Sequence, residues 1–233
     1  MLLSLKKGAG MNEQDAKPAP DALGGVEQDR IVVLSDGVFA FAITLLVLGI
    51  RVPDGVNSSD MSALVRSLLP PFLSYTISFI VVASYWLGHR RIMKAMTHVD
   101  RNFLWLNFLF LFFIAVFPVP TSLLGLNFGT VAPTIIYACC AAATGFSLWL
   151  LWIYASGKSR LLHPRFDPHE VRFRSGFYLL RSLVYLVCLV VLFVPSGPYI
   201  LFGLWAVLVP LLPPILRRVV LPHHKARKQG ATG

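Results

Sequence analysis

Long runs of apolar residues alternate along the chain with short polar or Pro/Gly-containing segments. The runs are continuous rather than alternating in polarity, which favours helices over strands, and each reaches about 20 residues, enough to cross a hydrocarbon core of about 30 Å. We therefore expect an all-α membrane protein with six transmembrane helices per subunit. The expected spans are residues 31–50, 69–88, 103–124, 131–155, 175–194 and 198–219.

Composition agrees with a membrane protein, since 56% of the 233 residues are hydrophobic. A soluble domain of this length buries one or two such runs, but not six. Residues 1–27 are rich in Gly, Ala, Pro and charges and contain no apolar core long enough for a signal peptide, so we expect a disordered N-terminal arm. Residues 28–220 form the expected transmembrane domain, and residues 221–233 form a basic tail.

The basic residues orient the expected bundle. Of 21 Lys and Arg residues, 19 fall on one side of the membrane, and only Arg51 and Arg66 fall on the other. The 19 include Arg181, which is counted with the connection between the fourth and fifth spans. Short cytoplasmic loops retain Lys and Arg, so both termini are predicted to be cytoplasmic. This bias and attraction to anionic membrane lipids explain the net charge of +10. The tail HHKARKQG carries no aromatic residues, so we expect no nucleic-acid partner.

Motifs of enzymes are missing from the sequence, which contains no Walker loop, G-x-S-x-G, HExxH or dinucleotide fingerprint. Cys139, Cys140 and Cys188 fall inside predicted spans and are interpreted as small buried apolar residues. We therefore expect no enzyme activity, catalytic residue, cofactor or bound metal.

Strongly polar residues inside the spans are the candidates for function, because such groups need a partner in a bilayer. Five lie at a similar depth on the cytoplasmic side of the first three helices: Ser35, Asp36, Trp86, His89 and Asn107. This placement predicts an interhelical hydrogen-bond network, in which Arg30, the Trp86 indole and His89 are the donors available to Asp36. Anchoring of Trp86 and His89 at the headgroup level is the alternative.

The first helix has two faces at about 100° per residue. Asp36 is rotated by about 140° from Phe41, and Ser35 by about 120° in the other direction. Arg30 extrapolates onto the side of Phe41, and the Thr44 hydroxyl has the carbonyl of Ala40 as an alternative partner within its own helix. The stripe opposite the acid comprises Phe41, Thr44, Leu45 and Leu48.

These residues carry a resemblance to a known family. The first helix resembles the Arg-x-x-x-Phe-Ser-Asp signature of the potassium-channel family named after lysosomal transmembrane protein 175, in its single-repeat prokaryotic form. The match continues through GVFAFAITLLVL, through FLSYTISFIVVASYWLGHRR in the second helix and through LWLNFLFLFFIAVFPVPTSLL in the third, where a turn is expected at 118–121. It covers roughly residues 28–125.

The resemblance implies a homo-oligomer in which four six-helix subunits surround a pore lined by their first helices, in the plasma (inner) membrane of a prokaryote. Potassium would be the permeating ion, with modest selectivity. The hydrophobic constriction falls on Phe41, with Leu45 and Leu48 on the same stripe, and the Thr that contributes to potassium preference falls on Thr44. Arg30 joins Ser35 and Asp36 in the network with the next two helices.

The sequence departs from the family at three positions. Leu34 replaces the motif Phe, Phe41 replaces an Ile or Leu, and Gly49 stands where many relatives carry Glu. No T-V-G-Y-G-like loop is present, so selectivity would come from partial dehydration and weak hydroxyl coordination. A secondary transporter and a membrane assembly protein without transport are the alternatives, although the RxxxLSD pattern occurs only once and reveals no internal repeat.

Overall fold

The protein is described by a computed structural model over residues 20–51, 61–157, 161–163, 168–201 and 203–205, with side chains from residue 28 onward. The longer elements are α1 (Pro20–Leu46), α2 (Met61–Ala95), α3 (Arg101–Val116), α4 (Pro118–Leu126), α5 (Val131–Ser156) and α6 (Pro168–Val187). Two 3-10 turns, η2 (Val47–Gly49) and η3 (Cys188–Phe193), continue α1 and α6.

Five segments of the described chain are long and apolar enough to cross a membrane, and each overlaps one of the first five predicted spans. They are Gln28–Gly49, Met61–Ala95, Arg101–Leu126, Val131–Ser156 and Pro168–Phe193. The expected all-helical membrane fold is thereby confirmed. The sixth predicted span, 198–219, is helical at 198–201 and 203–205, and its remainder lies outside the described residues, as do 1–19 and the predicted tail 221–233.

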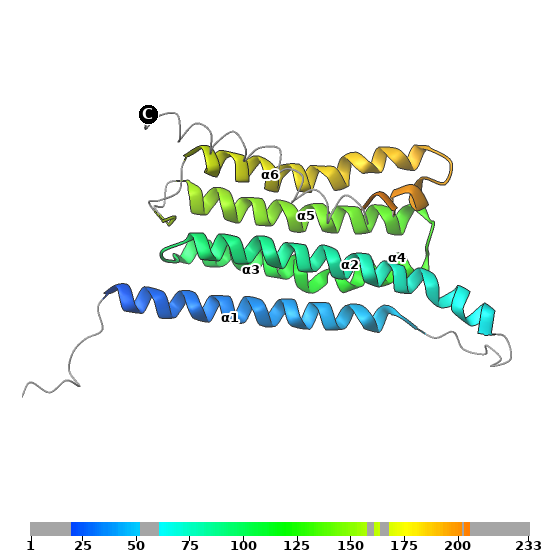
Figure 1. Ribbon diagram of the computed structural model, residues 1–233, viewed down its shortest axis with the longest axis horizontal. Helices are drawn as coiled ribbons and strands as arrows, with labels where there is room; N and C mark the ends of the chain where they lie inside the picture. Colours follow the sequence, from blue (N-terminus) through cyan, green and yellow to red (C-terminus); the bar gives the residue numbers. More distant parts are fainter. Residues whose placement is uncertain (1–19, 52–60, 158–160, 164–167, 202, 206–233) are drawn as a thin grey trace, which may run out of the picture.

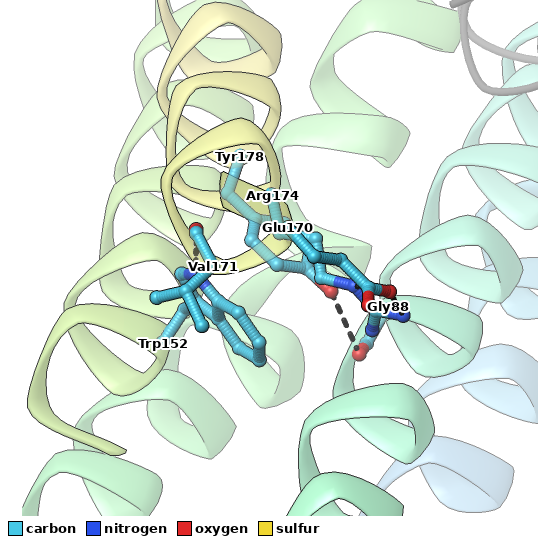
Figure 2. Close-up of polar contacts among 6 residues, drawn as sticks. All are labelled: Gly88, Trp152, Glu170, Val171, Arg174 and Tyr178. Carbon is cyan, nitrogen blue, oxygen red and sulfur yellow. Dashed lines mark hydrogen bonds and ion pairs between the residues drawn. The ribbon is translucent and has the colours of Figure 1, made fainter. Parts of the chain in front are cut away.

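Helix α6 begins earlier than expected, because its first two turns pack on α5 instead of forming a solvated loop. The indole Nε1 of Trp152 donates to the carbonyl of Val171 at 3.2 Å. The guanidinium of Arg174 pairs with Glu170 one turn earlier at 2.6 Å and lies 5.7 Å from the centroid of the Trp152 ring (Figure 2). Charged residues at the start of this amphipathic helix concealed it in the sequence.

Three other boundaries differ from the prediction. Helix α1 begins at Pro20, inside the arm predicted to be disordered, and α2 extends at both ends beyond residues 69–88. The third span divides at Phe117, because Pro118 has no N–H to continue α3 and instead occupies the first turn of α4. The turn expected at 118–121 is therefore helical.

The helices form a bundle with α1 at one side and the α5–α6 pair at the other (Figure 1). Helix α1 packs against α2 and α3, while α5 packs against α6, α3 and α4. Asp100, the N-cap of α3, links α3 to α5. Its carboxylate accepts from the N–H of Phe103 at 2.8 Å and from the hydroxyl of Tyr154 on α5 at 2.5 Å. The α1–α2–α3 contact contains the predicted polar residues.

Candidate functional site

One face of α1 is buried against α2 and α3. Its residues, spaced three or four apart, are Ile31, Ser35, Phe39, Ala42 and Leu46. This spacing places all five on one side of an α-helix. Ser35 is the one hydroxyl on this face and is fully buried, so it needs a hydrogen-bond partner there.

A hydrogen-bonded chain starts from Ser35 and crosses to α3 and α2. The Ser35 hydroxyl donates to the carbonyl of Ile31 at 2.8 Å. The Asn107 amide on α3 donates to the Ser35 Oγ at 3.2 Å, and the Asn107 Oδ1 lies 2.8 Å from Nε2 of His89 on α2. Three helices are thus joined through three buried side chains.

The direction of each bond in this chain follows from the first. A serine hydroxyl has one hydrogen, and that hydrogen goes to Ile31, so Ser35 Oγ must accept from the amide nitrogen of Asn107. The Asn107 oxygen then faces His89, which must carry a proton on Nε2 to donate to it. The bonding pattern therefore selects one amide orientation and requires a protonated His89 Nε2.

Aromatic rings surround the His89 side chain, which is 2% exposed. The imidazole stacks on Phe110 of α3 with a centroid distance of 5.4 Å and an interplanar angle of 12°. Phe39 of α1 lies 6.0 Å from the imidazole and 5.8 Å from Phe110. The rings exclude solvent, so the chain from Ser35 to His89 is satisfied within the subunit.

Asp36 belongs to a separate contact at the edge of the α1–α2 interface. Its Oδ1 accepts from the indole Nε1 of Trp86 at 2.7 Å, and the guanidinium of Arg90 lies 5.3 Å from the centroid of the same indole ring. Asp36 is exposed, unlike its neighbour Ser35. Among the described residues, Arg30 bonds to none of the five other network residues, and it lies exposed on α1 instead of joining them.

The exposed face of α1 carries the predicted stripe with one change. Phe41 and Leu48 are each 67% exposed, and Thr44 is exposed between them. Leu45 is half-buried and lies beside the stripe rather than on it. The Thr44 hydroxyl donates to the carbonyl of Phe41 at 2.8 Å, not to that of Ala40.

The stripe continues toward the start of the helix. Its members recur at intervals of four and three residues, which keeps them in line along α1, and the last of them lies in η2. They are Arg30, Leu34, Gly37, Phe41, Thr44 and Leu48, all exposed. A Cβ on Gly37 would meet nothing within 4 Å, so this face of the subunit is open along its length.

Sequence reasoning missed Arg181. It was counted with the basic residues of the cytoplasmic loop, yet the structure buries it inside α6, where it is 7% exposed. The available signal was its place within the predicted span 175–194, where an ionisable residue is expected to face protein and to have a partner.

Large apolar side chains remain exposed over the helices, including Trp105, Phe112, Val119 and Val190. Long apolar helices with such surfaces define an integral membrane protein. Residues 30–118 match the family model described as the endosomal/lysosomal potassium channel TMEM175. The chain belongs to this family of ion channels, which is not a family of enzymes, and is of its prokaryotic kind.

Two bacterial relatives and one solved structure support this assignment. The chain is 30% identical over 163 residues to a potassium channel of Streptomyces collinus, covering 68% of this chain and 79% of the relative. It is 35% identical over 165 residues to a potassium channel of Chamaesiphon minutus, covering 66% and 81%. The crystal structure of a lysosomal potassium-selective channel TMEM175 homolog from Chamaesiphon minutus matches with a TM-score of 0.71 at 30% identity, covering 82% of this chain and 98% of that one.

Proposed function

We propose that the protein is a cation channel with a modest preference for potassium over sodium, formed by four copies of the chain around a shared pore. In this proposal the channel lies in the plasma membrane of a prokaryote, and both of its termini are cytoplasmic. Its membership of the TMEM175 family supports this proposal, as do bacterial relatives that are themselves potassium channels.

The two faces of α1 are the observation that carries the proposal. One face is bonded to α2 and α3, while the other presents a continuous exposed stripe. A helix held on one side and open on the other is suited to line a pore between subunits. Phe41 and Leu48 supply the hydrophobic constriction, with Leu45 beside them, and an ion passing these rings sheds part of its water.

Thr44 supplies the polar contact in this stripe. Because its single hydroxyl hydrogen is donated to the carbonyl of Phe41, its oxygen lone pairs remain available to a cation. A hydroxyl is a weak ligand compared with a ring of carbonyl oxygens. It favours the ion that loses water more readily, which is potassium, and only by a modest factor.

The hydrogen-bonded residues have a structural role in this proposal. Ser35, His89 and Asn107 hold the buried face of α1, and the pair of Asp36 and Trp86 holds its edge. The permeating ion meets the exposed stripe instead. Arg30 lies at the cytoplasmic end of that stripe.

The deciding experiment is ion flux from purified protein reconstituted in liposomes, with potassium and sodium gradients measured in parallel and protein-free liposomes as the control. We expect potassium flux that exceeds sodium flux, and a native mass equal to four subunits. Intact oligomers without flux would exclude a channel. A mass other than four subunits with normal flux would exclude only the tetramer.

A further inference from the structure

Arg181 of α6 is a buried cation whose partners among the described residues lie on α2. Its Nη2 donates to the Ser84 hydroxyl at 2.6 Å and to the carbonyl of Val81 at 3.5 Å, while Nη1 donates to the carbonyl of Ser84 at 3.2 Å. Its Cζ lies 3.8 Å from the centroid of the Tyr85 ring. Within the described part of the chain, no carboxylate pairs with it.

This arrangement satisfies a charge that is expensive to place between membrane helices. Oxygen acceptors and an aromatic face together replace part of the hydration shell, and a planar guanidinium meets them with a fixed geometry. An Arg at such a site joins two helices through its hydrogen bonds. Removing it leaves the Ser84 hydroxyl and two carbonyls without their interhelical donor.

Tyr178 adds a second contact between the same two helices. Its hydroxyl donates to the carbonyl of Gly88 at 3.4 Å (Figure 2). Gly88 lies one helical turn after Ser84 on α2. Tyr178 and Arg181 are three residues apart on α6, and their acceptors span residues 81–88 of α2. Helix α6 therefore holds this stretch of α2 through two long side chains.

The same stretch of α2 holds α1 on another side. Trp86 and His89 are rotated by about 90° to 150° around α2 from the face that Arg181 contacts. Trp86 donates to Asp36 of α1, and His89 is joined through Asn107 to Ser35 of α1. Within about two turns, α2 thus connects α6 at one side of the bundle to α1 at the other (Figure 1).

We propose that Arg181 is a positioning residue for conduction: by fixing α2 it sets the position of α1, and so couples the α5–α6 pair to the pore. The inference rests on the proposed channel function. It requires that a change at Arg181 affect flux and the stability of α1 without changing which ion is preferred, because Arg181 does not contact the exposed stripe of α1.

The test compares Arg181→Met, which keeps a long side chain but removes the donors, with Arg174→Met as the matched control. Arg174 lies two turns closer to the start of α6, and its contacts with Glu170 and Trp152 are to α6 and α5. Wild-type and variant tetramers in liposomes are compared by potassium flux, by the potassium-to-sodium flux ratio, and by hydrogen exchange of α1 amides.

For Arg181→Met we expect potassium flux to change by about 2- to 30-fold, the range of a coupling mutation away from the ion path. The flux ratio should stay at the wild-type value, and amides of α1 around Ser35 should exchange faster by a similar factor. Arg174→Met should match wild type in all three. Arg181→Lys keeps the charge but cannot bridge both carbonyls and the hydroxyl, so its changes should be smaller and in the same direction.

Three results would overturn the inference. Wild-type flux and wild-type α1 exchange in Arg181→Met would do so, as would faster exchange confined to α2 and α6, which indicates a local stabilising role. If Arg181→Met does not fold, Arg181→Lys and Tyr178→Phe decide, and wild-type behaviour of both overturns it. Absence of flux in the wild type would instead overturn the channel function.

Discussion

Replacement of Asn107 by Leu tests the chain that joins the first three helices. Leu has the same number and branching of side-chain heavy atoms as Asn but is bulkier, so the substitution leaves no cavity. It removes two interhelical bonds, one to Ser35 and one to His89. Ser35 keeps its bond to the carbonyl of Ile31. The His89 N–H, by contrast, is left buried among aromatic rings without an acceptor.

The expected loss of stability follows from these contacts. Interhelical side-chain bonds in membranes contribute about 0.6 kcal/mol each. A buried donor without an acceptor costs about 1–3 kcal/mol. We therefore expect Asn107→Leu to lower the free energy of unfolding by about 2 kcal/mol. The potassium-to-sodium flux ratio should not change, because Asn107 is buried away from the exposed stripe.

The assay is unfolding in mixed micelles by titration with a denaturing detergent, followed by far-UV circular dichroism at fixed protein concentration. Asn127→Leu is the control, because Asn127 is exposed and bonds to its own helix at the carbonyl of Leu123, so its effect should stay within about 0.5 kcal/mol. The double variant with His89→Phe keeps a ring on Phe110 and removes the orphaned donor. The double variant should lose less unfolding free energy than the two single variants lose together, and the difference should be about 0.6–1.7 kcal/mol. The reasoning would be refuted if Asn107→Leu and Asn127→Leu lowered the unfolding free energy equally. It would also be refuted if the effects of Asn107→Leu and His89→Phe on that free energy were strictly additive.

Three further predictions concern single contacts. Trp86→Phe removes the donor to the Asp36 carboxylate and should lower the unfolding free energy by about 1.5–3 kcal/mol in the same titration, with the flux ratio unchanged. Thr44→Val keeps the side-chain shape but removes the hydroxyl, so the potassium-to-sodium flux ratio should fall toward one while the tetramer and its stability are retained; an unchanged ratio would remove Thr44 from selectivity. Gly145→Ala places a Cβ 2.6 Å from a serine hydroxyl of α6 and should destabilise by about 1–3 kcal/mol, whereas Gly176→Ala, with nothing within 4 Å, should stabilise by up to about 1 kcal/mol. A similar effect of both substitutions would contradict the packing described around α5 and α6.

Which residues of the network bond to one another could be determined only from the structure. The sequence grouped Ser35, Asp36, Trp86, His89 and Asn107 by depth, because polar groups at equal depth in adjacent helices can bond to one another. It did not show that Asp36 and Ser35, adjacent in sequence, belong to separate contacts. Successive residues point about 100° apart on a helix, so which neighbouring helix each one meets depends on how the three helices pack.

Hydrophobic pattern alone determined the membrane class, the all-helical fold and the approximate position of five spans, because a bilayer dictates their length and apolar character. The extent of α6 and the exposure of Arg30 were decided by tertiary structure. So was the environment of Arg181, which charge counting grouped with the basic residues of the cytoplasmic side. A long basic side chain reaches either water or a buried acceptor, and only the packing of α6 against α5, within reach of α2, brings Val81 and Ser84 close enough to bury it.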